Sequence, residues 1–150
     1  MSHLIACWWQ ILLAAFAYFV IGALWFNPKV FGTLWMKSHN LPAPTEEGRK
    51  GLPKLLAISY ALTVLICAAL CYVLGATTEC CDASMVHSST LFFHGIKVAL
   101  LLGCCVAGSS IAIAYTYQMK PLAAYLTDIG YHIIGCLAAV VVFHFTCACC

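Results

Sequence analysis

The chain has 150 residues, of which 64% are apolar and only 8% charged, and its formal net charge is +2. Soluble domains carry about a quarter charged residues, so this composition excludes an ordinary soluble domain. The small net charge, with no basic cluster outside one loop, also argues against a nucleic-acid-binding surface. We therefore expect a protein that lies in a lipid bilayer.

The apolar residues form four blocks, and each is long enough to cross the hydrocarbon core, which needs about 20 residues of helix. The blocks run from about residues 4–26, 55–75, 91–117 and 121–146. They are too long and too uniform for the alternating strands of a membrane barrel. The sequence therefore predicts an all-α polytopic membrane protein with four transmembrane helices in a single membrane domain, residues 1–150.

The connector after the first block carries a short amphipathic segment. In NPKVFGTLWMKSHN, residues 27–40, the apolar side chains recur at spacings that place them on one helical face. This pattern predicts an interfacial helix over about residues 28–38, lying in the plane of the membrane surface. The following residues 40–53 are rich in Pro, Gly and charge, which predicts a loop.

Basic residues are divided unevenly between the two sides of the membrane. The side that holds the first and third connectors has six of them, whereas the other side has only Lys97, inside the third block. Short loops rich in Lys and Arg stay in the cytoplasm, so we expect both chain termini on the outer side. The six are Lys29, Lys37, Arg49, Lys50, Lys54 and Lys120.

Ionisable side chains interrupt the fourth block at Asp128 and His132, which lie one helical turn apart on a shared face. A charge at bilayer depth costs roughly 2.5 to 3.5 kcal/mol even on lenient insertion scales, so such groups face a protein interior or a wet cavity. The connector between the third and fourth helices is only about residues 118–120, so these helices are expected to form a tight antiparallel hairpin. That hairpin sets Asp128 opposite Ser110.

Two interpretations of this pair stay open. In the first, Asp128 is a structural clamp, neutralised by His132 or hydrogen-bonded to a hydroxyl such as that of Ser109 or Thr127. In the second, the pair belongs to a site that binds a proton or a small solute, because Asp and His groups recur in proton-coupled membrane transport. The candidate binding residues are Asp128, His132, Tyr131, Trp25, Ser110 and Tyr60.

Two stretches carry a resemblance to a known family. The first, GALWFNPKVFGTLWMK at residues 22–37, follows the pattern G-x-x-W-x-x-P-x-x-F-G-x-x-W-M. The second, PLAAYLTDIGYHIIG at residues 121–135, contains D-x-G-Y-H. Both resemble the signatures of an uncharacterised bacterial membrane family, domain of unknown function 1761.

Members of that family are similar to this chain in length and in having four hydrophobic segments. Phe26 stands where the family usually has Tyr, and the resemblance weakens between residues 40 and 90. It implies that Trp25, Trp35 and the residues around Asp128 belong to one recurring design. No activity comes with it.

Eleven cysteines depart from the family pattern. Those inside helices are expected to act as small apolar side chains. The others gather at the predicted outer face with several histidines, which leaves disulfides or a Zn or Cu(I) site as alternatives. With the opposite orientation, the CACC tail would instead suit lipidation. The sequence assigns no cofactor; candidate metal ligands are Cys80, Cys81, Cys147, Cys149, Cys150, His94 and His144.

The chain contains no phosphate-binding glycine loop, nucleophile elbow or HExxH pattern, so we do not expect an enzyme of the soluble type. The first hypothesis is a membrane protein that binds or transports a proton or small solute at Asp128 and His132. Four helices are few for a solitary transporter, so this hypothesis implies a homo-oligomer. The second is a non-catalytic accessory subunit with partner membrane subunits, and the third is a thiol or metal redox module at the outer face.

Overall fold

The computed structural model describes residues 7–42, 46–78 and 88–147 of the chain. Every regular element within these residues is helical, and none of them forms a strand. Four helices are long and apolar enough to cross a membrane. The predicted fold class, an all-α polytopic membrane protein with four spans and a short helix after the first, is confirmed.

The third span is divided into two α-helices joined by a wider π-helical stretch, and the segment after the first span also begins with a π-helical turn. The elements are α2 (Trp8–Trp25), η1 (Pro28–Gly32), α3 (Thr33–Ser38), α4 (Glu46–Thr78), α5 (Ser88–Leu100), η2 (Leu101–Gly108), α6 (Ser109–Tyr117) and α7 (Leu122–Cys147).

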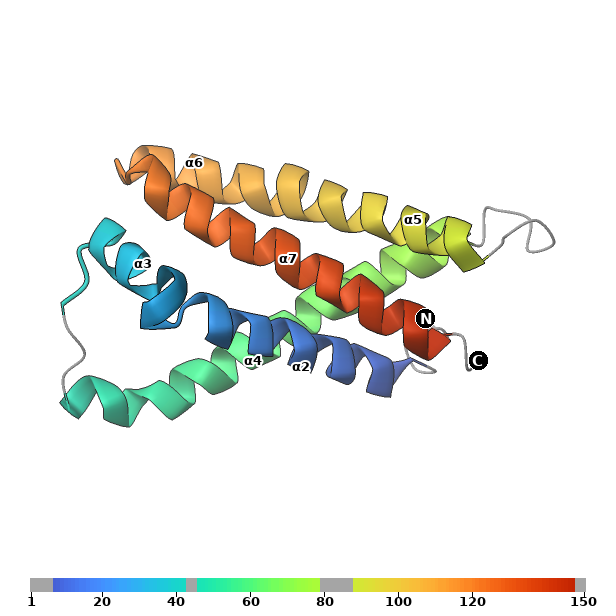
Figure 1. Cartoon of the computed structure of the whole chain (residues 1–150), viewed down its shortest axis with the longest axis horizontal. Coiled ribbons are helices and arrows are strands. Elements are labelled where there is room, and N and C mark those ends of the chain that lie inside the picture. Colours follow the sequence, from blue (N-terminus) through green and yellow to red (C-terminus); the bar gives the residue numbers. More distant parts are fainter. Residues whose placement is uncertain (1–6, 43–45, 79–87, 148–150) are drawn as a thin grey trace.

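Helix α7 is the central element of the bundle (Figure 1). The third span runs beside it as one arm of a hairpin, α2 packs against it on another side, and α4 crosses the bundle obliquely. η1, α3, the α6–α7 turn and the start of α4 all lie at one end of the molecule, which we call the α3 end. The start of α2, the end of α4 and the start of α5 lie at the opposite end.

The predicted hairpin of the third and fourth helices is present. A Cβ at Gly103 would lie 3.3 Å from the Ile133 backbone, and one at Gly95 would lie 2.7 Å from a Val140 methyl. These pairs sit at matching heights on two antiparallel helices. The backbones approach closely because small residues replace bulky ones at the contact, as is common where helices pack in membranes.

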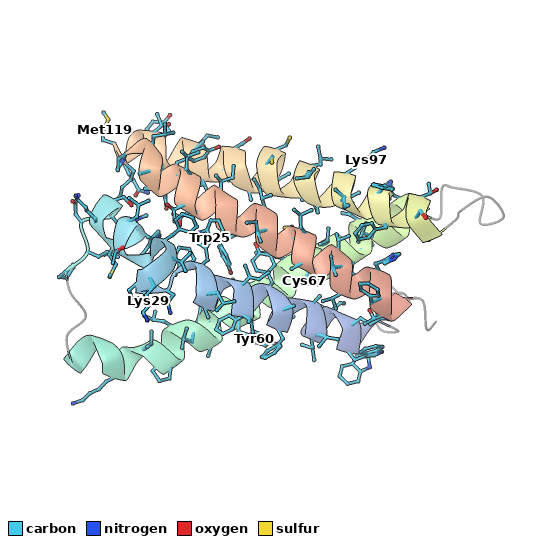
Figure 2. All side chains as sticks on the ribbon, in the orientation of Figure 1. Trp25, Lys29, Tyr60, Cys67, Lys97 and Met119 are labelled. Atoms are coloured by element: carbon cyan, nitrogen blue, oxygen red, sulfur yellow. The ribbon has the colours of Figure 1, made fainter. Side chains whose placement is uncertain are left out.

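Tyr18 of α2 is fully buried against α7, next to Cys67 and Leu70 of α4. A Cβ at Gly135 would overlap the Tyr18 ring, so only glycine allows this ring to lie flat against α7. Figure 2 places Cys67 at the centre of the bundle and Tyr60 where α4 crosses α2. The core thus forms where the three helices meet.

Helix α4 begins at Glu46, whereas the sequence predicts a loop over residues 40–53 and a helix only from about 55. Pro53 lies inside this helix, although proline removes one backbone hydrogen bond there. Good helix formers on both sides of Pro53 favour the helical conformation. The predicted interfacial helix over residues 28–38 is present as η1 followed by α3.

Candidate functional site

The carboxylate of Asp128 accepts hydrogen bonds from two aromatic side chains on different elements. Trp35 Nε1 of α3 donates to Oδ1 over 2.9 Å, and the Tyr115 hydroxyl of α6 donates to Oδ2. His39 Nε2 lies 3.6 Å from the same Oδ2 and 3.0 Å from the Tyr115 oxygen. The Asp128 and His39 side chains are each only 13% exposed. We call these four residues the Asp128 cluster.

Asp128 follows the first residue of α7 by six positions, which is about 9 Å along the helix axis. The cluster therefore lies in the part of the span nearest the α3 end rather than at its middle. Three separate segments of chain converge on one carboxylate there.

A turn between α2 and η1 directs the following segment back onto α7. Asn27 adopts an extended backbone conformation, and its side chain accepts a hydrogen bond from the Lys29 backbone N–H over 3.0 Å. A proline at the first position of η1 suits this start, because its fixed φ matches a helical turn. The Phe31 and Trp25 rings then stack with centroids 4.4 Å apart, which fixes the direction of the segment.

Helix α3 presents Trp35 and His39 together because they are four residues apart on one face. Their ring centroids are 4.8 Å apart, and His39 Nδ1 lies 3.0 Å from the Trp35 carbonyl. The segment ends at Asn40, whose φ of 55° lies in the left-handed region. The Leu41 N–H then bonds the Met36 carbonyl over 3.0 Å, closing the last turn as helix C-termini commonly do.

Two further contacts attach the end of α2 and the segment after it to the hairpin. Lys120 Nζ, in the α6–α7 turn, donates to the His39 carbonyl over 3.4 Å. Trp25 Nε1 donates to the Thr127 carbonyl over 3.0 Å. Gly130 makes room for this indole, since a Cβ there would lie 2.9 Å from the Trp25 ring, which Figure 2 shows between α2 and α7.

His132 has a separate partner, one turn further from the α3 end. Its Nδ1 lies 2.7 Å from the Tyr18 hydroxyl, which also approaches the His132 carbonyl at 3.4 Å. The Tyr131 ring packs edge-to-face against Tyr18, with centroids 5.2 Å apart, and against Phe26, also at 5.2 Å. Aromatic rings thus fill the space between His132 and the Asp128 cluster.

Of the residues predicted for the site, four gather around α7 and two do not. Ser110 is exposed and donates to the Val106 carbonyl of its own segment over 2.8 Å. Tyr60 donates to the Leu12 carbonyl over 3.2 Å, at the crossing of α4 and α2. The four that gather are Asp128, His132, Tyr131 and Trp25.

The described hydrogen bonds of the Asp128 carboxylate are not those that the clamp interpretation considered. Among the described residues its partners are Trp35, Tyr115 and His39. The Thr127 hydroxyl donates instead to the Ala123 carbonyl of its own helix over 2.7 Å. The partners considered from the sequence were His132, Ser109, Ser110, Tyr60 and Thr127.

Sequence reasoning missed His39, Tyr115 and Tyr18 as site residues. The spacing of Trp35 and His39 carried a signal for one of them, because i, i+4 neighbours share a helical face. Tyr115 was missed because the prediction paired residues at equal distances from the hairpin turn, which set Asp128 opposite Ser110. Tyr115 lies nearer the turn, and its long side chain reaches along the helix to the carboxylate.

The predicted metal ligands fall mostly outside the described residues, which exclude 79–87 and 148–150, and no side-chain position is described for Cys147. His94 Nε2 lies 2.8 Å from the Thr77 hydroxyl, and His144 packs against the Phe92 ring at 4.8 Å. Within the part of the chain that the structure describes, no three His, Cys, Asp or Glu side chains are grouped to hold a metal. Disulfides or a metal at the outer face stay predictions.

No curated protein and no solved structure matches the sequence. A family described as Protein of unknown function (DUF1761) matches residues 9–144, a range that includes the Asp128 cluster and the Tyr18–His132 pair. Because this match spans most of the chain and both signature stretches, the protein belongs to the DUF1761 family.

Proposed function

We propose that the protein binds and releases a proton at the Asp128 cluster, and that this step drives movement of a proton or small solute across the membrane. The observation that carries the proposal is the partner set of the carboxylate. Its hydrogen-bond donors are an indole and a phenol, and the nearest basic side chain is His39, whose Nε2 lies 3.6 Å away. Imidazole changes charge near neutral pH, unlike Lys or Arg.

For an ion pair that only stabilises the fold, Lys or Arg is the suitable partner, because its charge does not change near neutral pH. Among the described residues, Lys120 contacts the cluster, and its ammonium donates to the His39 carbonyl and not to Asp128. The basic side chain nearest the carboxylate is therefore an imidazole and not a fixed cation. This arrangement supports proton exchange between Asp128, Tyr115 and His39.

His132 and Tyr18 continue this arrangement toward the centre of the membrane. Asp128 and His132 lie one turn apart, about 6 Å along the axis of α7, and the aromatic rings between them have to move for a proton to pass. Beyond His132, α7 buries the apolar residues Ala139, Val140 and Phe143. These apolar side chains offer no group that carries a proton. A proton at His132 therefore reaches the opposite end only if the helices repack, or if a second copy of the chain supplies polar groups.

A second candidate function is that of a non-catalytic accessory subunit, favoured by the fact that both carboxylate oxygens are already bonded within the chain. In that role, the Asp128 cluster would hold α3, α6 and α7 together without exchanging protons. The two functions differ in what Asp128→Asn does, because an amide still donates and accepts hydrogen bonds but does not titrate.

Proton binding is tested by infrared difference spectroscopy of the reconstituted protein during a pH titration. The proposal expects a protonated carboxyl band that Asp128→Asn removes and that Ser110→Ala, a matched change on the exposed side of α6, leaves in place. A titration spectrum that is the same in wild type and Asp128→Asn would show that this carboxyl does not exchange a proton.

Transport is tested separately, with liposomes that contain a pH-sensitive dye and carry an imposed membrane potential. Wild-type protein should conduct protons faster than empty liposomes, and both Asp128→Asn and His132→Gln should return the rate to that of empty liposomes. If correctly assembled Asp128→Asn keeps the wild-type rate while Asp128→Leu fails to assemble, the cluster is a clamp and the accessory role is favoured.

A further inference from the structure

Four lysine side chains at the α3 end are exposed, and none forms an ion pair with another described residue. Lys29 belongs to η1, Lys37 to α3, and Lys50 and Lys54 to α4. We infer that this end of the molecule binds the headgroups of anionic phospholipids, with these four ammonium groups contacting the lipid phosphates.

The balance of charge at the α3 end supports an anionic partner. The sequence has six basic residues in the segments that meet at this end, against Glu46, Glu47 and Asp128, which leaves an excess of three positive charges. Asp128 is engaged by its own cluster and does not neutralise a lysine. An uncompensated positive surface next to a membrane attracts anionic lipids.

The apolar side chains beside the lysines supply the surface for the acyl chains. In the interfacial segment, Val30 is 54% exposed and Leu34 is 44% exposed, although both are aliphatic. An amphipathic helix with lysines beside such side chains lies in the interface, with its apolar face at the boundary between headgroups and acyl chains. Lys29 and Lys37 then lie at the height of the phosphates.

The turns of α4 from Lys50 to Ser59 are exposed around the whole helix. The exposed leucines and isoleucine among these residues point in different directions around the helix. This stretch belongs to a candidate membrane span, so lipid is the medium that surrounds it. Lys50 and Lys54 share one face at i, i+4 spacing, at the end of the span where headgroups begin.

A second copy of the chain is a poorer occupant of this surface. In a symmetric dimer, the same patch would face itself, so Lys50 and Lys54 would meet their own counterparts. Like charges in that position repel each other, whereas a lipid phosphate neutralises them. The exposed lysines therefore favour anionic lipid over self-association along this half of α4.

The test uses full-length protein purified in mixed micelles of phosphatidylcholine and phosphatidylglycerol, with bound lipid counted by native mass spectrometry. For the wild type, the fraction of phosphatidylglycerol among the bound lipids should exceed its fraction in the micelles. Each lysine replaced by glutamine, as in Lys29→Gln or Lys54→Gln, should weaken this enrichment by about fivefold. Lys97→Gln is the matched control, since Lys97 projects from α5 away from the α3 end (Figure 2).

Exposed lysines are safe positions for substitution, and helical circular dichroism verifies folding of each variant. Equal enrichment in wild type, Lys29→Gln and Lys54→Gln would overturn the inference, as would an equal loss in Lys97→Gln. Wild-type protein that shows no preference for phosphatidylglycerol, or that forms a lipid-free dimer through α4, would overturn it as well.

Discussion

Replacing Trp35 with phenylalanine removes the Nε1 donor of the Asp128 cluster while keeping an aromatic ring at that position. The lost hydrogen bond is 2.9 Å long and ends on a carboxylate oxygen, and bonds to a charged group contribute about 1.5 to 3 kcal/mol. The remaining ring still packs between Phe26 and His39, whose centroids lie 5.3 and 4.8 Å from that of Trp35. The variant should therefore lose stability mainly through one bond.

Trp25→Phe is the matched control, because it removes the same atoms from a neighbouring indole. Its Nε1 donates over 3.0 Å to a neutral backbone carbonyl, and a bond of that kind contributes about 0.5 to 1.5 kcal/mol. Trp35→Phe should accordingly cost about 1 to 2 kcal/mol more than Trp25→Phe. Unfolding in detergent micelles, followed by circular dichroism, measures both.

A double-mutant cycle then tests the cause of the difference. In an Asp128→Asn background, the bond from Trp35 ends on a neutral amide, so the extra cost of Trp35→Phe should fall toward that of the control. Equal costs for the two tryptophan variants in the wild-type background would refute the assignment of a charged acceptor at Asp128. An extra cost that persists unchanged in Asp128→Asn would refute it too.

Two further predictions concern packing and orientation. Gly135→Ala should destabilise the protein by about 1 to 3 kcal/mol in the same assay, because the added Cβ overlaps Tyr18, whereas Gly51→Ala meets nothing within 4 Å and should be neutral or stabilising. A similar effect of both would argue against the close contact of α2 and α7. A tag inserted between α3 and α4 should resist labelling from outside intact cells, as the distribution of basic residues requires, and efficient labelling there would reverse the orientation.

The fold class was predictable because the constraint that sets it is local and strong. Backbone groups in lipid have no water to bond, so long apolar blocks must be helical wherever they lie. The start of α4 was not predictable in the same way, since Gly48, Gly51 and Pro53 resemble loop residues and the helix nevertheless runs through them from Glu46. The π-helical stretch η2 leaves no distinct pattern in Leu101–Gly108.

The candidate site was predictable at its centre and not at its partners. Asp128 and His132 stand out because ionisable groups inside an apolar block are energetically costly unless they are paired or face a polar site. The partners depend on how η1 and α3 turn back after Asn27, which brings Trp35 and His39 to the fourth span from far away in the sequence. The i, i+4 spacing suggested a contact between Asp128 and His132, but aromatic donors on other elements bond to each of them instead.

The chemistry of the two donors bears on the proposed proton exchange at Asp128. Trp and Tyr carry a polar tip on an apolar body, so they bring an N–H and an O–H to the membrane interior without adding a charge. Bonds from Trp35 and Tyr115 are strongest while Asp128 is ionised, because charge-assisted hydrogen bonds are roughly twice as strong as neutral ones. In the proposed function, a proton on the carboxylate would therefore weaken the attachment of α3 to α7 and α6 while it removes the charge. Holding the segments together and responding to a proton would then be two consequences of the same contacts.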